Sequence, residues 1–467
     1  MLVRKTETNR AAVHRRRAVW ERGIAAFFSC LCRCPGKGGI MQTITITGGQ
    51  TLHGTIRPAA AKNSVLPLLA ATLLCGAPCC LRGAPALSDV DTSLALLEAV
   101  GAKAVRHGAD LCTLPVHAAD LCGEIPPHLA GAMRSSVFYL APLLCRVGMV
   151  RLPLPGGCRL GPRPVDIHLA GLAAMGARVE LEGEAVTLRR TGPLQGVDFA
   201  LRLPSVGATM TLLMAACCAM GTTVLRGAAC EPEVCDLAAF LCACGAKISG
   251  AGTPLIVIQG RHTLGGTLYT PLPDRIAAAT YAAALAAAGG TITVEGCAPA
   301  YYEAFLQFLE QTGVAVTRHE SAVTLQRDPG CRLRGGQHLY ANGWPAFATD
   351  TAPLAAAVLL EAEGASEIYD HLFDNRFACA AGFRAMGADC QASGHRLRIA
   401  GSADLHAATV SAPDLRGGAA LMVAALAASG TTVLQDPGHI RRGSADLPAE
   451  LARLGAQCIP LRQAPVR

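Results

Sequence analysis

Aromatic residues make up only 4% of this 467-residue chain and charged residues 16%, whereas hydrophobic residues reach 51%. So few rings indicate a core in which helices pack closely against sheets through small side chains. Long apolar runs are also missing, because residues 210–220 and 277–288 are shorter than the roughly 20 residues that span a bilayer. A longer segment, 64–81, is interrupted by two prolines and a glycine. The sequence therefore predicts buried helices and no membrane span.

The 21 cysteines include no C-x-x-C pair, so their spacing indicates neither a zinc ribbon nor a thioredoxin-type redox pair. The sequence shows no secretory signal, and we therefore expect most cysteines to be reduced core residues of a cytoplasmic protein. We expect no metal ion and no organic cofactor.

Positive charge is concentrated in residues 1–40, which hold nine Lys or Arg against Glu7 and Glu21. Two interpretations are open: an arm that binds nucleic acid or a membrane surface, and a disordered leader before an internal start at Met41. We favour the leader, because the first regular strand pattern, 43–46, begins just after it. The remaining chain is nearly neutral, so we expect no nucleic-acid partner and no membrane partner.

A helix that ends at a glycine and leads into two short strands recurs six times. The first set of marker glycines is Gly101, Gly176, Gly245, Gly313, Gly387 and Gly455. A second set, each followed by a β-rich run, is Gly76, Gly148, Gly221, Gly290, Gly364 and Gly430. A unit of about 70 residues cannot bury its apolar face alone, whereas three packed units can. The repeat therefore predicts an α/β protein of two three-unit domains.

The domain boundaries follow from the repeat. Residues 41–61 plus 273–467 are expected to form the first three-repeat domain, residues 62–272 the second, and residues 1–40 an N-terminal extension. The chain would then cross between the domains twice, which suits a hinge. Ligands usually bind in the cleft between such domains.

A glycine-rich loop, residues 155–168, places Cys158 among cations, a carboxylate and an imidazole. Nearby cations favour a reactive thiolate, although a tight turn with an incidental cysteine fits the loop equally well. Further cations recur where apolar helices begin or strands end, namely Lys62, Arg134, Arg275, Arg416 and Arg442. Together with Arg163 they predict a cleft that attracts a small molecule with several negative charges.

From Met41 onward the chain resembles the UDP-N-acetylglucosamine enolpyruvyl transferase (1-carboxyvinyltransferase) family. The resemblance rests on residues 61–63 with 66–67, 89–93, 133–135, 155–168, 205–209, 231–233, 273–276, 345–347 with 349–350, 373 with 375–377, 414–416 and 442–443. It implies a two-domain inside-out α/β barrel. It also implies transfer of the enolpyruvyl group of phosphoenolpyruvate to the 3′-hydroxyl of UDP-N-acetylglucosamine with release of phosphate, the first committed step of peptidoglycan synthesis.

The resemblance also implies roles for single residues. Cys158, the family's fosfomycin-alkylated cysteine, would be the general acid, and Asp350 would take a proton near the sugar hydroxyl. The positions that would bind phosphoenolpyruvate are Lys62, Asn63, Arg163, Arg416 and Arg442, of which Lys62 and Arg442 also count as catalytic. The positions that would contact UDP-N-acetylglucosamine are Asn63, Arg134, Arg163, Pro164, Val165, Asp166, Ile167, Ser205, Val206, Asp350 and Leu372. His168 and Phe373 either line the pocket or serve to order the loop and to pack.

The chain departs from the family pattern at Leu203, which replaces a lysine that meets the diphosphate, and at residues 277–279, which are all alanine. Two alternatives therefore stay open: a non-catalytic binding paralogue and a transferase that uses shikimate 3-phosphate. RNA 3′-terminal phosphate cyclases share a related architecture, but the neutral body argues against RNA. The sequence leaves the oligomeric state open.

Overall fold

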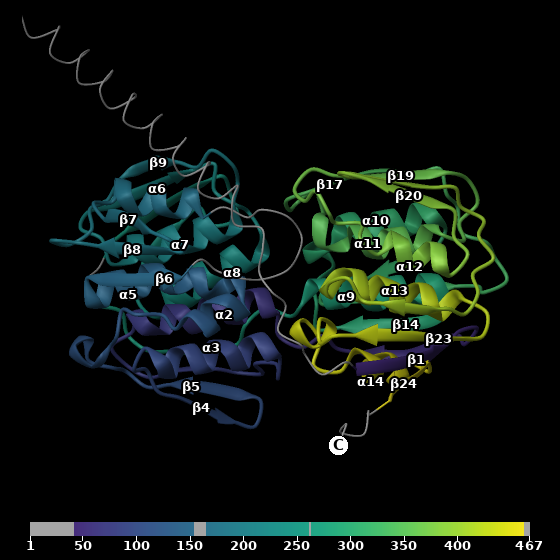
Figure 1. Ribbon diagram of the computed structural model, residues 1–467, viewed down its shortest axis with the longest axis horizontal. Coiled ribbons are helices and arrows are strands. Elements are labelled where there is room, and N and C mark those ends of the chain that lie inside the picture. The colour runs from purple at the N-terminus through teal and green to yellow at the C-terminus, as the bar shows by residue number, and fades with distance from the viewer. Residues whose placement is uncertain (1–41, 154–164, 261–262, 462–467) are drawn as a thin grey trace, which may run out of the picture.

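The computed structural model describes residues 42–153, 165–260 and 263–461. Figure 1 shows two α/β lobes side by side, each with helices in its interior and sheets on its outside. The N-terminal extension 1–40 and the site candidates Cys158, Arg163 and Pro164 lie outside the described residues.

The second lobe, residues 62–269, is drawn in purple to teal in Figure 1. Its elements are α2 (Lys62–Ala71), η1 (Thr72–Leu74), β3 (Cys79–Leu81), α3 (Ser88–Ala99), β4 (Ala104–His107), β5 (Asp110–Thr113), η2 (Ala118–Asp120), α4 (Pro127–Ala132), η3 (Arg134–Tyr139), α5 (Leu140–Val147), β6 (Met149–Pro153), α6 (Asp166–Ala174), β7 (Arg178–Glu182), β8 (Ala185–Arg189), β9 (Asp198–Ala200), α7 (Val206–Cys217), β10 (Thr222–Arg226), α8 (Pro232–Ala243), β11 (Lys247–Ser249), β12 (Leu255–Gln259) and β13 (Leu268–Tyr269).

The first lobe combines residues 42–56 with residues 275–461. Its elements are β1 (Gln42–Thr47), β2 (Leu52–Ile56), α9 (Arg275–Ala288), β14 (Gly290–Glu295), η4 (Pro299–Tyr301), α10 (Glu303–Thr312), β15 (Ala315–Arg318), β16 (Ala322–Arg327), β17 (His338–Asn342), β18 (Phe347–Ala348), η5 (Thr349–Thr351), α11 (Ala352–Leu359), β19 (Ser366–Asp370), α12 (Ala380–Ala385), β20 (Cys390–Ser393), β21 (Arg396–Ile399), β22 (Thr409–Ser411), α13 (Leu415–Ala427), β23 (Thr431–Asp436), η6 (Ile440–Arg442), α14 (Leu447–Arg453) and β24 (Gln457–Leu461).

The six sheets are variants of one strand order. They read β4-β5-β3-β13, β7-β8-β6, β11-β12-β10-β9, β15-β16-β14-β2, β20-β21-β19-β17-β18 and β24-β1-β23-β22. Each begins with the strands that follow a first-set glycine and continues with the strand that follows a second-set glycine. In the last sheet, β1 pairs antiparallel with both β24 and β23, so the start of the chain supplies a strand to the final repeat.

Each lobe closes on itself through parallel strands exchanged between units. β9, β17 and β22 each come from the end of one unit and pair parallel with the next unit's sheet. In the second lobe, β13 returns from the end of the third unit to the first, and in the first lobe β2 pairs with β14. Three units therefore form a ring in each lobe.

The first-set glycines have the backbone conformation that their position demands. All six have φ between 93° and 104°, a left-handed region that a side chain would strain. They follow the last turns of α3, α6, α8, α10, α12 and α14, so the predicted helix ends are confirmed.

Two hydrophobic cores account for the alanine-rich composition. One contains buried residues between 65 and 264, and the other contains residues between 44 and 56 together with residues between 278 and 458. In the first lobe, α9, α11 and α13 pack on one another. Nine of the fourteen residues of α9 are alanine, so the helix axes can approach closely. No helix in the described part of the chain is long and apolar enough to cross a membrane.

The described cysteines include one disulfide that spacing did not reveal. Cys80 and Cys112 lie opposite each other on β3 and β5 and are bonded, with a Cα–Cα distance of 4.1 Å. The other described cysteines are thiols.

Candidate active site

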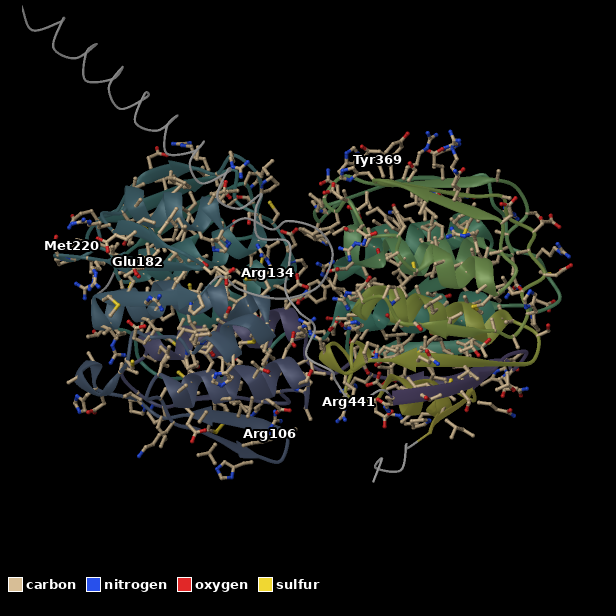
Figure 2. All side chains as sticks on the ribbon, in the orientation of Figure 1. Arg106, Arg134, Glu182, Met220, Tyr369 and Arg441 are labelled. Carbon is tan, nitrogen blue, oxygen red and sulfur yellow. A yellow bond between two sulfur atoms is a disulfide. The ribbon has the colours of Figure 1, made fainter. Side chains whose placement is uncertain are left out.

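Three charged side chains meet where the two lobes face each other. Lys62, the first residue of α2, places its Nζ 2.6 Å from Oδ2 of Asp89 on α3. Arg442, at the end of η6 in the other lobe, donates to the same carboxylate from Nε at 3.0 Å and from Nη2 at 3.3 Å. Ser88 adds a contact from its hydroxyl to the carbonyl of Arg441, which Figure 2 places at the junction of the lobes. One carboxylate thus holds two cations from different lobes.

Burial and neighbouring charges together shift the pKa values of Lys62 and Asp89. Burial lowers the pKa of Lys62, and the cations Arg442 and Arg416 lower it further, while Asp89 partly offsets both. For Asp89, burial acts to raise the pKa, but the attraction of Lys62 and Arg442 outweighs burial and holds it below its usual range. The site therefore concentrates positive charge around a single carboxylate, and an anionic ligand would relieve that excess.

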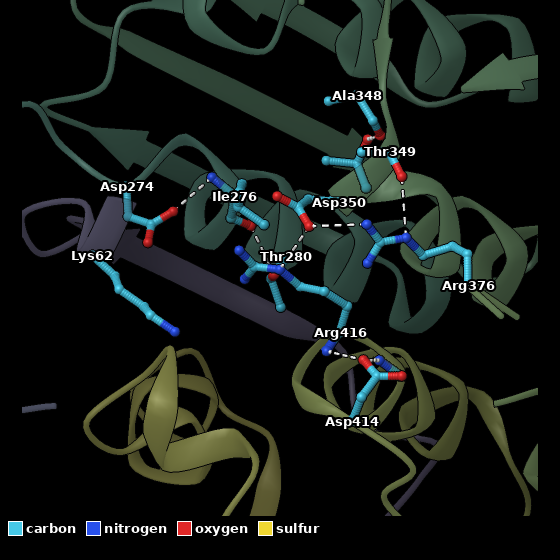
Figure 3. A network of polar contacts seen from close by, with 12 residues as sticks. Lys62, Asp274, Ile276, Thr280, Ala348, Thr349, Asp350, Arg376, Asp414 and Arg416 are labelled. Carbon is cyan, nitrogen blue, oxygen red and sulfur yellow. Dashed lines mark hydrogen bonds and ion pairs between the residues drawn. The ribbon is translucent and has the colours of Figure 1, made fainter. Parts of the chain in front are cut away.

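A second group of charges surrounds Asp350, which lies on η5 just before α11. Its Oδ1 is 3.3 Å from Nε of Arg416 and 3.4 Å from Nη2 of Arg376. Figure 3 shows Asp350 between these two guanidinium groups, with Lys62 projecting toward the same region. The influence of Arg416 on the pKa of Lys62 agrees with this proximity.

Arg376 is fixed from behind by buried groups. It is only 1% exposed, its Nε donates to Oγ1 of Thr349 at 3.1 Å, and the same nitrogen lies 3.6 Å from Oδ2 of Asp370. The Thr349 hydroxyl also donates to Asp370, and Arg376 lies over the Phe373 ring at 4.3 Å. Asp350 is therefore oriented by an arginine that cannot itself move freely.

These side chains share a position at the beginning of buried helices. Lys62 begins α2, Arg275 begins α9, Asp350 precedes α11, and Arg416 lies in the first turn of α13, whose N-terminus Asp414 caps. A helix N-terminus carries partial positive charge and free backbone donors. The fold therefore adds helix dipoles to the charge of the side chains.

Arg275 has a different role from the other predicted cations. It is buried and forms a two-point ion pair with Glu233 of α8, with Nε–Oε1 at 2.9 Å and Nη2–Oε2 at 3.3 Å. The pair joins the start of α9 to the other lobe. The prediction that Arg275 contributes to attracting an anion is therefore replaced by a connecting role, because its charge is already compensated.

The predicted nucleotide-sugar positions on α6 differ in exposure. Val165 and Ile167 are buried, at 1% and 7% exposed. Asp166, the first residue of α6, pairs with Arg202 through Oδ2, while its buried Oδ1 has no hydrogen-bond partner among the described residues. Among these three, Asp166 has an acceptor atom left for a ligand.

The other predicted nucleotide-sugar positions lie at element ends. Ser205 caps α7 by accepting from the amide of Ala208, and Val206 and Asn63 are half-buried at the starts of α7 and α2. Arg134 begins η3, and Figure 2 shows it in the second lobe. Leu372 is exposed in the first lobe. These positions are thus divided between the two lobes.

His168 and Phe373 have packing partners. His168 is buried, its Nδ1 lies 3.0 Å from the Thr211 hydroxyl, and burial together with nearby Arg134 lowers its pKa to about 3. It is therefore a neutral residue that joins α6 to α7. Phe373 packs beneath Arg376, as described above.

The comparisons with known proteins agree with this architecture. The family model for EPSP synthase (3-phosphoshikimate 1-carboxyvinyltransferase) matches residues 46–451. UDP-N-acetylglucosamine 1-carboxyvinyltransferase 1 of Symbiobacterium thermophilum is 41% identical over 89% of this chain and 94% of its own length. The UDP-N-acetylglucosamine 1-carboxyvinyltransferase of Nitratidesulfovibrio vulgaris is 40% identical over 89% of this chain and 99% of its own length.

Solved structures show the same fold. The enolpyruvyl transferase NikO from Streptomyces tendae matches with a TM-score of 0.81 at 25% identity, covering 91% of this chain and all of its own. EPSP synthase from Acinetobacter baumannii matches with a TM-score of 0.68 at 18% identity, covering 90% of this chain and all of its own. The predicted two-lobed α/β fold is confirmed.

The fold, the family model and the relatives together identify the chain as an enolpyruvyl transferase. Within that class, the chain belongs to the UDP-N-acetylglucosamine 1-carboxyvinyltransferase family, as the resemblance in its motifs predicted.

Proposed function

We propose that this protein transfers the enolpyruvyl group of phosphoenolpyruvate to the 3′-hydroxyl of UDP-N-acetylglucosamine and releases phosphate, the first committed step of peptidoglycan synthesis. The observation that carries the proposal is the convergence of three cations from both lobes: Lys62 and Arg442 share Asp89, and Arg416, which contacts Asp350, acts on the pKa of Lys62. The relatives at about 40% identity support the choice of acceptor.

Phosphoenolpyruvate offers a phosphate and a carboxylate to these cations. We assign its phosphate to Lys62, Arg442 and Arg163, its carboxylate to Arg416, and a neighbouring contact to Asn63. Charge-assisted hydrogen bonds from fixed cations are stronger than neutral ones. Anionic character that develops during the reaction would be stabilised by the same groups in a closed site, which gives Lys62 and Arg442 their catalytic role.

The reaction consists of an addition and an elimination. In the addition, the sugar oxygen bonds to C2 of phosphoenolpyruvate, Asp350 takes the hydroxyl proton, and Cys158 delivers a proton to C3. In the elimination, C3 loses a proton and C2 loses phosphate, which leaves the enolpyruvyl ether. The salt bridges to Arg376 and Arg416 hold the Asp350 carboxylate in place, which supports its assignment as the base.

The nucleotide sugar would contact residues of both lobes. We assign to it Asn63, Arg134, Arg163, Pro164, Val165, Asp166, Ile167, Ser205, Val206, Asp350 and Leu372. Within the described part of the chain the buried Oδ1 of Asp166 has no partner, and this supports the assignment, since a ligand donor would satisfy it. Leu203 is exposed at 56% and cannot supply a cation, so the diphosphate has one contact fewer than the family pattern gives.

We assign residues 41–61 plus 273–467 to the first domain and residues 62–272 to the second. The two hydrophobic cores and the return of β1 to β23 support this division. The chain crosses twice: the amides of Ala61 and Asp274 donate to the carbonyls of Leu272 and Ala59. We place the enzyme in the cytoplasm and assign it no cofactor.

The experiment is phosphate release by the purified full chain. The protein is mixed with phosphoenolpyruvate and either UDP-N-acetylglucosamine or shikimate 3-phosphate. We expect release only with the nucleotide sugar, and mass spectrometry should find its enolpyruvyl ether. If phosphate is released with shikimate 3-phosphate but not with the nucleotide sugar, the enzyme uses shikimate 3-phosphate as its acceptor. If neither acceptor leads to phosphate release, the result supports a non-catalytic binding paralogue.

A further inference from the structure

Three cysteine thiols outside the candidate active site converge in the second lobe. Cys75 follows η1, Cys79 begins β3, and Cys244 follows α8. Their sulfur atoms all lie within 4.8 Å of one another, and those of Cys75 and Cys244 are 3.7 Å apart. We call Cys75, Cys79 and Cys244 the three-thiol cluster. All three residues are buried, at 2%, 1% and 4% exposed.

Backbone hydrogen bonds hold the cluster in place. The amide of Gly76 donates to the carbonyl of Leu264 at 2.8 Å, and the amide of Gly265 donates to the carbonyl of Cys244 at 2.7 Å. One short segment, 264–265, thus ties the Cys75 loop to the end of α8. The thiols are therefore positioned by main chain that is already paired, which reduces the entropy lost on binding a ligand.

The spacing of the sulfur atoms suits one central thiophilic ion. A metal–sulfur bond of about 2.3 Å places sulfur ligands of the same ion about 4 Å apart. Among the described residues, the group contains these three thiols and no additional His, Asp or Glu. Zinc prefers four ligands. A site with three buried ligands therefore favours an ion that is stable with a coordination number of three.

Charge decides which three-coordinate ion fits best. Three thiolates carry three negative charges, and a net charge is costly to bury. A trivalent ion gives a neutral complex, whereas a monovalent ion would leave two negative charges in the core and a divalent ion would leave one. We propose that the three-thiol cluster is a binding site for a trivalent thiophilic ion of the arsenite or antimonite class.

The binding step is an exchange without redox change. Arsenous acid, As(OH)₃, reacts with three thiols to form three As–S bonds and three waters, and arsenic stays trivalent. Each thiol proton leaves in water with one arsenic hydroxyl. The bound ion would tie η1 and β3 to the end of α8 and stabilise the second lobe.

The cluster is separate from the other functional groups. Lys62 begins α2 and Cys75 lies beyond its far end, so the ten-residue helix puts roughly 15 Å between them. Cys79 and Cys80 are consecutive in β3, and successive side chains in a strand point to opposite faces. Cys79 is buried, whereas Cys80 is half-buried and bonded to Cys112.

The test uses the full chain in a background where Cys30, Cys32 and Cys34 are serine. Those three cysteines alternate in the sequence outside the described residues and offer arsenite a second set of thiols. After arsenite treatment, intact mass under native conditions should show one added arsenic less three hydrogens. Cys75→Ala, Cys79→Ala and Cys244→Ala should each lose this adduct, whereas Cys458→Ala, which removes a buried thiol in the first lobe, should keep it.

Two further measurements keep the proposal falsifiable if a variant fails to fold. X-ray absorption on the arsenite-treated background should find three sulfur neighbours around arsenic, and arsenite should raise the thermal unfolding midpoint of that protein but not of Cys244→Ser. An arsenic with fewer than three sulfur neighbours would overturn the proposal. So would an adduct that persists in all three alanine variants, or zinc bound more tightly than arsenite by the same thiols.

Discussion

The carboxylate of Asp89 accepts hydrogen bonds from Arg442 across the junction of the two lobes, at 3.0 and 3.3 Å, and also lies 2.6 Å from Lys62. Because Asp89 is almost fully buried, it is the counter-ion that keeps two cations in place before an anionic substrate arrives. A phosphate group between Lys62 and Arg442 would meet the same donors. If Lys62 and Arg442 bind phosphate as proposed, Asp89 would connect the contact between the lobes to recognition of phosphate.

Replacing Asp89 with Asn should destabilise the protein and make its stability depend on phosphate. Breaking a buried ion pair typically costs about 3–5 kcal/mol, because the remaining charges are left uncompensated. Inorganic phosphate should restore more stability to Asp89→Asn than to the parent, since an anion replaces the lost carboxylate. Denaturant unfolding with and without phosphate measures both effects. The control is Asp91→Asn, an exposed position on the same helix, and equal phosphate effects in all three proteins would contradict the prediction.

The lowered pKa of Lys62 predicts an early alkaline limit to activity. Between its folded-state pKa and the ordinary 10.5, the folded protein binds fewer protons than the unfolded chain, so Lys62 loses its charge at lower pH when folded. We expect kcat/KM for phosphoenolpyruvate to fall about tenfold per pH unit above that pKa. In Lys62→Arg the guanidinium stays charged, so the alkaline fall in kcat/KM should move to higher pH. If kcat/KM falls at the same alkaline pH in both proteins, a group other than Lys62 is responsible for the fall.

Replacing Asp350 with Asn should slow turnover much more than it weakens nucleotide-sugar binding. A positioned general base typically contributes about 10²–10⁴ in rate, and Asn cannot accept the proton. Phosphate release measures kcat, and calorimetry measures the affinity for UDP-N-acetylglucosamine. Arg376→Lys is a second variant for the same measurements. It keeps a positive charge near Asp350 but loses the planar guanidinium group that contacts the carboxylate. A kcat for Asp350→Asn within a few-fold of the parent would remove Asp350 from the mechanism.

The sequence revealed the repeat and the cations but not their partners. The first-set glycines could be predicted as helix ends, because a left-handed backbone conformation there favours glycine. Lys62 and Arg416 could be predicted as site residues, because they lie at the starts of apolar helices. Asp89 lies in the motif 89–93, but its role as a shared counter-ion could not be predicted, because an acidic residue in the first turn of α3 equally suits the helix dipole. The motif 231–233 likewise did not mark Glu233 as the partner of Arg275, and nothing local marked the three-thiol cluster, since these contacts join segments far apart in the sequence.

Loss of the buried pair between Arg275 and Glu233 should cost more than loss of an exposed pair of similar geometry. Glu233→Gln leaves the buried Arg275 guanidinium without its hydrogen-bonded counter-charge, and we expect a loss of about 3–5 kcal/mol in unfolding free energy. Asp198→Asn removes the partner of Arg226 in an exposed two-point pair and should change stability little. Chemical denaturation of the parent and the two variants measures the contrast. Equal losses would mean that burial does not govern these pairs.

Fosfomycin should modify this protein at Cys158. The thiolate would open the epoxide, forming one S–C bond and leaving a hydroxyl after protonation, so the chain gains the whole mass of the inhibitor. Cys158→Ser should lose the adduct, while Cys122→Ser and Cys331→Ser, which remove exposed thiols, should retain it. Peptide mass spectrometry locates the label, and a label on another cysteine would contradict the role of Cys158.

The chemical role of Cys158 can be separated from its reactivity by a third substitution. Cys158→Asp removes the nucleophilic sulfur but keeps a group that can donate a proton, so it should resist fosfomycin and still release phosphate at a reduced rate. Cys158→Ser should be much slower, because a hydroxyl is a far weaker acid than either a thiol or a carboxylic acid. If Cys158→Asp is as inactive as Cys158→Ser, proton donation alone does not explain the cysteine, and a covalent bond between its sulfur and the substrate becomes the better account.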